Sequence, residues 1–184
     1  MSIKVVTGPN TLFSFVNIFQ PKSINGTDPK YSMQVRIPKD DRKTIAKIEN
    51  AMKQAYEEGA AKLKGNSKSV PAYETLKKPL RDGETEFPDD ESYKGYFFIN
   101  ANNSQKPGVV DGDCNPILDP SEVYSGCFGR VSMNFFAFNN NGNKGIAASI
   151  NNVQKLRDGT PLSGHSRPED DFGGEEDDDD DFLS

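Results

Sequence analysis

The chain has little of what enzymes usually need for catalysis. Its 184 residues include one His, two Cys and no Trp, and no Walker-type phosphate loop. The single His165 lies beside the acidic end of the chain, so the body cannot assemble a Ser-His or Cys-His pair or a His-bound metal site. We therefore expect no enzymatic activity and no cofactor.

The chain also lacks the features of secreted and membrane proteins. Cys114 and Cys127 are too few for a disulfide framework, so we expect them to serve packing in a reducing cytoplasm. No apolar run approaches the ~20 residues of a membrane span, and the N-terminus has no signal-peptide core. These absences favour a soluble cytoplasmic protein.

Negative charge is concentrated at one end of the chain. The formal net charge is -6, but residues 169–184 hold 10 of the 28 acidic side chains and no Lys or Arg. Residues 1–168 therefore carry 18 acids against 22 bases, a net charge of +4. A mildly basic body with a strongly acidic end indicates a nucleic-acid partner.

The hydrophobic pattern predicts a mainly β domain. Short apolar runs bounded by Gly, Pro or Asn predict strands at 3–6, 11–20 and 31–37 and four more beginning at 93, 108, 126 and 144. Helical spacing predicts one main helix over 40–64, and Asn141-Gly142 predicts a tight hairpin turn. Residues 66–92 form a long excursion with one short helix near 72–77. This element order is typical of a five-stranded OB-fold barrel with an added strand.

Two domain-level regions follow from this pattern. Residues 1–160 are expected to form the OB-fold domain. Residues 161–184 combine Pro, Gly and like charges, which cannot bury enough apolar surface to offset chain entropy. We expect this region to be a disordered linker and acidic tail.

Alternation within two strands places rings, amides and cations on one face. In the strand from Tyr93, one face carries Tyr93, Phe97, Ile99 and Ala101, and the other carries Lys94, Tyr96, Phe98, Asn100 and Asn102. In the strand from Gly126, the apolar set Val131, Met133, Phe135 and Ala137 opposes Phe128, Arg130, Ser132, Asn134, Phe136 and Phe138. Bases stack on aromatic rings while Lys and Arg follow the phosphates, so this mixture indicates a single-stranded-DNA (ssDNA) surface with little base preference. The alternative is that these rings pack beneath the helix or the excursion.

The remaining candidate contacts lie near the N-terminus. In the strand 11–20, Phe13, Phe15, Asn17 and Phe19 oppose Leu12, Ser14, Val16 and Ile18, and either face could be buried. Phe15 and Phe19 are candidate stacking rings. Lys22 and Lys30 flank the following loop as phosphate contacts or as ordinary surface. In the third strand we expect Tyr31, Met33, Val35 and Ile37 to face the core, and Ser32, Gln34 and Arg36 to face water.

One acidic segment imitates a calcium loop. Asp111, Asp113, Asn115, Asp119 and Glu122 occupy loop positions 1, 3, 5, 9 and 12. Position 6 requires Gly and holds Pro116, and strands flank the segment instead of helices. The alternative metal site would be a magnesium site of a nuclease, held by Asp111, Asp113 and Asp119. We expect an acidic turn loop and no metal.

The acidic tail has two physical roles open to it. Its carboxylates can lie in the cationic groove of the body in place of phosphates. Its apolar Phe182, preceded by Asp177, Asp178, Asp179, Asp180 and Asp181, can instead enter a pocket on a partner protein. A tail that only improves solubility is the alternative.

Four segments together resemble a known family. They are VVTGPNTLFSFVNIFQP at 5–21, SEVYSGCFGRVSMNFFAFN at 121–139, NKGIAASINNVQKLRDGTPLSG at 143–164, and the acidic end. In this order they resemble bacteriophage ssDNA-binding proteins first catalogued as a domain of unknown function, which share an OB fold and an acidic tail ending in Phe. Leu183 and Ser184 follow Phe182 here, which departs from tails that end on the aromatic residue.

The resemblance implies coating of ssDNA in phage DNA replication, recombination and repair in the host-cell cytoplasm. It also implies that the tail contacts replication or recombination proteins. The competing hypothesis is an acidic interaction module, or a DNA mimic, without DNA binding of its own. The sequence leaves open whether the protein forms a homodimer and whether it anneals strands.

Overall fold

Eight strands account for most of the regular structure in the computed structural model, which describes residues 3–23 and 26–162. The strands are β1 (Ile3–Val6), β2 (Thr11–Lys22), β3 (Lys30–Pro38), β4 (Arg81–Asp82), β5 (Tyr96–Asn103), β6 (Gly108–Val110), β7 (Phe128–Asn140) and β8 (Asn143–Arg157). The helices are α1 (Arg42–Glu58), α2 (Ala60–Lys64) and α3 (Gly83–Glu86), with 3-10 turns at Tyr73–Thr75, Glu91–Tyr93 and Pro120–Glu122. The seven strands expected from the sequence are all present, and β4 is an eighth.

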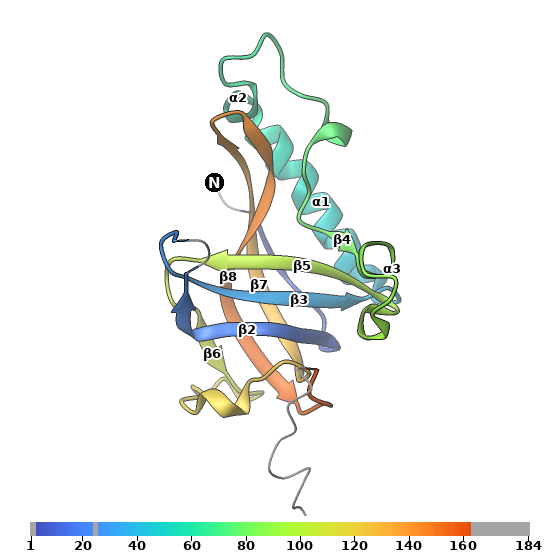
Figure 1. The fold of residues 1–184 in the computed structure, drawn as a ribbon, viewed down its shortest axis with the longest axis vertical. Helices are drawn as coiled ribbons and strands as arrows, with labels where there is room; N and C mark the ends of the chain where they lie inside the picture. The colour runs from blue at the N-terminus through green and yellow to red at the C-terminus, as the bar shows by residue number, and fades with distance from the viewer. Residues whose placement is uncertain (1–2, 24–25, 163–184) are drawn as a thin grey trace, which may run out of the picture.

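Five of the strands close into a barrel. β2 pairs with β3, β3 with β5, β8 with β7 and β7 again with β2, all antiparallel, while β5 and β8 pair in parallel. Figure 1 shows β2, β3 and β5 crossing the β7–β8 pair. β1 extends the sheet beyond β7, and β6 extends it beyond β8. The predicted OB-type barrel is confirmed.

Apolar side chains from the strands fill the barrel interior, most of them at alternating positions. The largest fully buried side chains in the strands are Phe13, Ile18, Met33, Val35, Ile37, Phe98, Ile99, Met133, Phe135 and Ile150. All except Phe98 belong to the main core cluster. Complete burial of an apolar side chain of this size contributes about 1.5–3 kcal/mol.

The predicted helix is present, but a glycine divides it. Asp41 caps α1 through its carboxylate, which accepts a hydrogen bond from the Thr44 amide at 3.3 Å. α1 ends at Gly59, where a Cβ atom would approach the Ala137 Cβ atom to 2.3 Å. The close approach to β7 therefore requires glycine, and the chain continues from it as α2.

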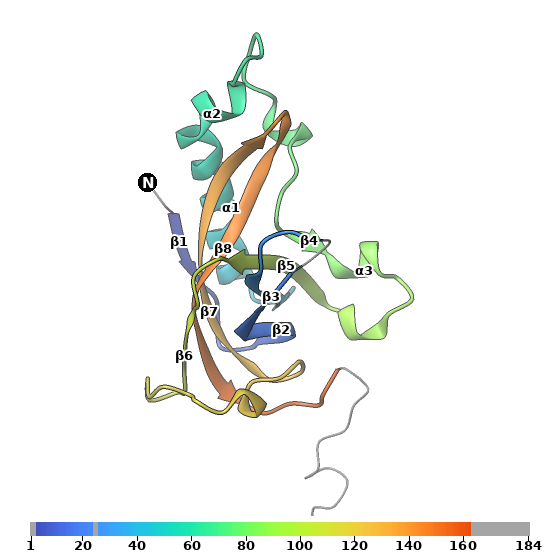
Figure 2. The ribbon, with the colours of Figure 1, turned by 60° about the vertical axis from the view of Figure 1, so that its left-hand side comes forward.

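β7 and β8 form a long hairpin whose upper arm rises above the three crossing strands, with α1 and α2 beside it (Figures 1 and 2). Its turn residues Asn141 and Gly142 have φ values of +53° and +90°. Two successive positive φ values are the requirement of a type I′ turn, so the predicted hairpin is confirmed.

The excursion 66–92 is a cover for the outer surface of the sheet. The Ile146 amide donates to the Lys77 carbonyl at 2.8 Å, and β4 adds to β5 with Arg81 opposite Phe98. The short helix expected near 72–77 is only a 3-10 turn, Tyr73–Thr75. Residues 82–93, which we call the strap, leave β4 and cross the outer face of β3 and β5.

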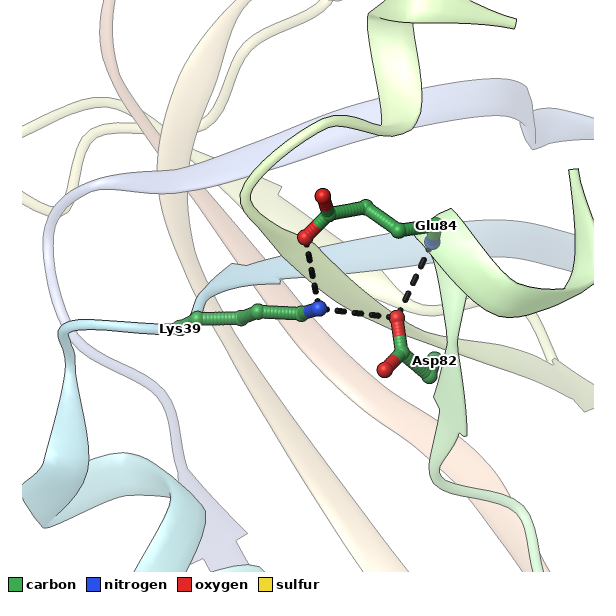
Figure 3. Close-up of polar contacts among 3 residues, drawn as sticks. All are labelled: Lys39, Asp82 and Glu84. Atoms are coloured by element: carbon green, nitrogen blue, oxygen red, sulfur yellow. Dashed lines mark hydrogen bonds and ion pairs between the residues drawn. The ribbon is translucent and has the colours of Figure 1, made fainter. Parts of the chain in front are cut away.

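Salt bridges fasten the strap to the barrel (Figure 3). The Lys39 ammonium lies 2.9 Å from the Asp82 carboxylate and 2.6 Å from the Glu84 carboxylate. The pKa of both carboxyl groups is lowered, mainly because each accepts a hydrogen bond from Lys39. The same contacts raise the pKa of Lys39.

The acidic segment 111–122 is a turn. The Asp111 carboxylate accepts hydrogen bonds from the amides of Asp113 and Asn115 at 2.9 and 3.0 Å. Within the ranges 3–23 and 26–162, no three His, Cys, Asp or Glu side chains are grouped so that they could hold a metal ion. None of the helices described is long and apolar enough to cross a membrane. Cys127 is buried in the core, and Cys114 is exposed in this turn.

Candidate nucleic-acid interface

Strand pairing creates a polar floor on the outside of the barrel. Directly paired residues place their side chains on the same face of a sheet. The pairs Ser14–Gln34, Gln34–Asn100, Ser32–Asn102 and Asn102–Ser149 therefore form one surface across β2, β3, β5 and β8. The Gln34 amide donates to the Asn100 side-chain oxygen at 3.2 Å, and Asn100 and Asn102 are exposed. Ser14 and Gln34 are buried, and we call the accessible residues of this surface the polar floor: Ser32, Asn100, Asn102 and Ser149.

A groove of about 570 Å³ opens beside this floor. It lies between the hairpin arm and the end of the excursion. The lining residues are Lys77, Lys78, Pro79, Arg81, Asn100, Phe138, Ile146 and Ala147. Cations, an aromatic ring and an amide therefore meet in one concave surface.

Phe138 forms the hairpin side of the groove, and Phe136 lies two positions before it on the same face of β7. The predicted alternation holds along β7: Val131, Met133 and Phe135 are fully buried and Ala137 nearly so, while Phe136 is 40% exposed and Phe138 half-buried. Phe138 pairs with Gly145, where a Cβ atom would lie 2.9 Å from the Phe138 ring. The glycine thus leaves room for the ring to lie across β8.

Three cations line the opposite wall. Lys77 is exposed. The Lys78 ammonium donates to the Tyr73 carbonyl at 2.7 Å and lies 4.4 Å from the centre of the Tyr73 ring. Arg81 forms a salt bridge with Glu86 and lies 5.1 Å from the centre of the Phe98 ring. None of the three is predicted from the sequence, because this segment has no strand or helix periodicity; the only signal is the Lys77-Lys78 doublet.

The predicted exposure of Phe98 is wrong. Its side chain is fully buried, with the Tyr93 and Phe87 rings 5.5 and 5.7 Å away. Tyr93 was assigned to the opposite strand face, but it lies before β5 in a 3-10 turn and belongs to the strap. The strap therefore covers Phe98. For this ring, the alternative that it packs beneath the excursion is correct.

The expectation that Gln34 and Arg36 face water is also wrong. Arg36 is 2% exposed and Gln34 is 5% exposed. The Arg36 guanidinium lies 3.8 Å from the centre of the Tyr93 ring and donates to Gln34, Ser14 and Ser92. Burial lowers the pKa of Arg36, against the opposing effect of Tyr93 and Asp90. Hydrogen bonds and ring stacking thus hold a buried cation beneath the strap.

A second group of predicted residues lies far from the groove. Phe128 is stacked under Arg157, whose guanidinium carbon is 4.2 Å from the ring centre. The Arg130 side chain donates to the Thr7 carbonyl at 3.0 Å. Phe128 precedes Phe138 by ten positions on the same strand, about 33 Å at the usual rise per residue. These residues do not line the groove, and Arg157 was not a predicted site residue.

Tyr96 and Lys94 also lie outside the groove. Tyr96 is half-buried, and burial raises its pKa while nearby Arg36 and Arg157 oppose that effect. Lys94 is exposed at the end of the strap, beside Gly95. Of the residues predicted on β5, Asn100 alone lines the groove.

A β-bulge settles which face of β2 is buried. Phe15 has a φ of +47°, and the β2–β3 register shifts between Ser14 and Asn17. The bulge lets both Phe13 and Ile18 point into the core, so neither strict face predicted from the sequence is buried throughout. Phe15 is left 62% exposed. A bulky residue with positive φ is strained, and such strain is concentrated at functional positions.

The other predicted N-terminal contacts flank the β2–β3 loop. Phe19 is half-buried, and Lys22 pairs with Lys30, both exposed. The predicted partner-binding residues Asp177 to Phe182 lie outside the described residues. Leu162 still donates to the Ser125 carbonyl at 2.9 Å, so ordered contacts run just past the predicted boundary at 160.

A family model described as the ssDNA-binding protein of Enterobacter phage Enc34 matches residues 3–183. The chain belongs to this family. It is 30% identical over 162 residues to putative protein p50 of Acyrthosiphon pisum secondary endosymbiont phage 1, covering 84% of each chain.

Solved structures agree with this assignment. This chain is similar to the ssDNA-binding protein of bacteriophage Enc34 in complex with ssDNA. The TM-score is 0.65 and the identity 27%, and the match covers 88% of this chain and 89% of that one. It shares its fold with gp2.5, an ssDNA-binding protein encoded by bacteriophage T7. The TM-score is 0.59 and the identity 16%, and the match covers 100% of this chain and 96% of gp2.5.

Proposed function

We propose that this protein binds ssDNA in the groove between the β7–β8 hairpin and the excursion, with little base preference, during phage DNA replication, recombination and repair. In this proposal it is a non-enzymatic coating protein of the host-cell cytoplasm. Membership of a family of ssDNA-binding proteins supports the ligand class. The observation that supports the site is the meeting of Phe138, Asn100, Lys77 and Arg81 in one groove.

Each part of the groove suits one part of the ligand. Phe136 and Phe138 offer ring faces, on which any base can stack for about 1–3 kcal/mol. Lys77 and Arg81 supply positive charge for phosphates without reading sequence. The exposed amides of Asn100 and Asn102 can donate to or accept from any base edge. Binding should therefore depend strongly on salt and weakly on base identity.

Phe15, Phe19, Lys22 and Lys30 form a second part of the proposed path, at the β2 end of the polar floor. The register places Asn17 opposite Ser32, and Ser32 opposite Asn102. A strand lying across the floor would thus run from the β7 rings toward the exposed Phe15 ring.

Anisotropy titrations with labelled oligo-dT test the site. The variant Phe138→Ala/Lys77→Gln removes one ring and one cation that line the groove. The matched variant Phe128→Ala/Arg157→Gln also removes one ring and one cation, but from the Phe128–Arg157 pair outside the groove, which we call the distant cluster. We expect the first to weaken binding about 10- to 100-fold and the second to change it less than about threefold.

Two outcomes would contradict the proposal. If the unmodified protein ignores oligo-dT at low salt, the function is wrong, and an interaction module without DNA binding becomes the better account. If the distant cluster matters more than the groove, the function stands and the site is wrong.

We further propose that the acidic tail competes with DNA for the cationic groove and recruits replication or recombination proteins. Its ten acids and the net charge of +4 of residues 1–168 support an attraction between the tail and the body. The apolar Phe182 within this polyanion supports a partner pocket that combines an apolar site with basic residues.

A further inference from the structure

Four lysines gather at the tip of the β7–β8 hairpin. We call Lys62, Lys64, Lys68 and Lys144 the lysine tip. The Lys144 ammonium donates to the Ser67 hydroxyl at 2.7 Å and to the Lys64 carbonyl at 3.4 Å. The Asn139 side chain donates to the Lys62 carbonyl at 2.9 Å. These contacts bring α2 and the start of the excursion against the hairpin end.

Acidic side chains flank the lysine tip in sequence but form no salt bridge with it: Glu57 and Glu58 precede Lys62, and Glu74 follows Lys68 by six positions. Residues 59–73 and 139–145 contain no Asp or Glu. Among the salt bridges of the described residues, none involves any of these four lysines. Lys62, Lys64 and Lys68 are exposed. Within the part of the chain that the structure describes, salt bridges therefore do not neutralise the positive charge at the tip.

The lysine tip is continuous with the groove. Phe138 and Gly145 form one β7–β8 pair, and the next pair toward the turn is Asn139 and Lys144. Lys77 forms a bridge with Gly145 on the other side, so the groove wall and the tip meet at that residue. Because side chains alternate faces along a strand, Asn139 and Lys144 point away from the Phe138 face, so a strand stacked on Phe138 reaches the tip by passing over the hairpin end.

The other end of the excursion has the opposite charge. Residues 82–91 of the strap contain six acids and no Lys or Arg. They are Asp82, Glu84, Glu86, Asp89, Asp90 and Glu91. A polyanion in the groove is therefore repelled by the strap and attracted toward the hairpin tip.

We propose that the lysine tip is a second contact surface for the same DNA strand, which leaves the groove past Phe138 and passes over the hairpin end. The ligand there is the phosphodiester backbone alone, because the tip offers ammonium groups and no exposed ring. This inference rests on the proposed function. It predicts that the tip matters only for oligonucleotides long enough to extend beyond the groove.

The test compares oligo-dT of about 6 and about 25 nucleotides, chosen around the usual site size of an OB fold, in full-length protein over a range of salt concentrations. The variant is Lys62→Gln/Lys64→Gln/Lys68→Gln, which leaves Lys144 in place to hold the loop. The control is Lys43→Gln/Lys47→Gln/Lys53→Gln, which removes the same charge from exposed positions of α1.

The expected result depends on length. The tip variant should bind the short oligonucleotide within about twofold of the unmodified protein and the long one about tenfold more weakly at low salt. Its slope of log affinity against log salt for the long oligonucleotide should be shallower by about 2, since each lost phosphate contact removes about 0.7. The α1 control should retain the original slope.

Three outcomes would overturn the inference while leaving the proposed function in place. The tip and control variants could behave alike, which would indicate a general charge effect. Both oligonucleotide lengths could be weakened equally, which would place the lysines in the primary site. Tighter binding by the tip variant would show that the lysines hold the acidic tail instead. If the unmodified protein binds neither oligonucleotide, the proposed function itself fails, and the inference fails with it.

Discussion

Aromatic residues that strand alternation predicts to be exposed have different environments in this protein. Phe136 is 40% exposed beside the groove, whereas Phe98 is fully buried under the strap. Strand alternation predicted the face of each ring, because side-chain direction is a local property. It could not predict which part of that face is covered, because the cover comes from residues 82–93 and depends on long-range contacts.

Replacing Phe138 with Ala should weaken binding of oligo-dT by about 1–3 kcal/mol, roughly 5- to 150-fold, through loss of one stacking surface. Fluorescence anisotropy measures the change. Leu118→Ala is the control, because Leu118 is an 86% exposed apolar side chain outside the groove. Equal affinities for the Phe138 variant and the unmodified protein would remove this ring from the site.

Replacing Phe98 with Ala should instead affect folding. Loss of a fully buried phenyl ring costs about 3–5 kcal/mol in the free energy of unfolding, which urea denaturation followed by circular dichroism can measure. A variant of unchanged stability but weak DNA binding would show that Phe98 acts as a stacking ring after all.

Several elements were predictable because their signals are local. The apolar spacing of α1, the alternation of β7 and the Asn141-Gly142 turn were each read from a short stretch and confirmed. The bulge at Phe15 was not predicted, because the sequence around it fits either strand face. The strap was not predicted either. Its position depends on contacts with Arg36 of β3 and with Lys39, which follows β3, and both residues are distant from the strap in sequence.

The strap anchor gives a pH-dependent prediction. Lys39→Met should lower the thermal midpoint at neutral pH, because it removes the partner of both Asp82 and Glu84. The folded-state pKa of each carboxyl is lowered, so this stabilisation is present at neutral pH. It is lost as the pH falls through the folded pKa values, which lie below the usual range of about 4.

Thermal unfolding of both proteins between pH 7 and pH 3 measures this effect. The difference between the two thermal midpoints should decrease as the pH falls toward 3. Leu118→Met is a suitable control for the substitution itself, since Leu118 is exposed and belongs to neither the strap nor the core cluster. A gap that stays constant with pH would show that the ion pairs do not stabilise the strap.

At the scale of the whole molecule, positive and negative charges are separated twice. The acidic end conceals a body of net charge +4, and within that body the lysine tip and the strap carry opposite signs. The sequence showed the first separation directly. The second became visible only when the fold brought residues 62–68 and residue 144 together at one end of the groove.

Deleting residues 169–184 should tighten binding of oligo-dT at low salt, because it removes ten acidic side chains that compete with phosphates. The gain should shrink as salt rises, because the attraction between tail and body is screened. Salt-dependent titration of the intact and shortened chains measures both. Unchanged or weaker affinity after deletion would contradict the competition between tail and DNA.

Photocrosslinking of oligo-dT to the intact protein, followed by peptide mapping, tests the location of the bound strand most directly. If the strand lies in the groove, crosslinked peptides should come mainly from residues 77–81 and 136–147. Crosslinks concentrated instead around Phe128, Arg130 and Arg157 would contradict this location.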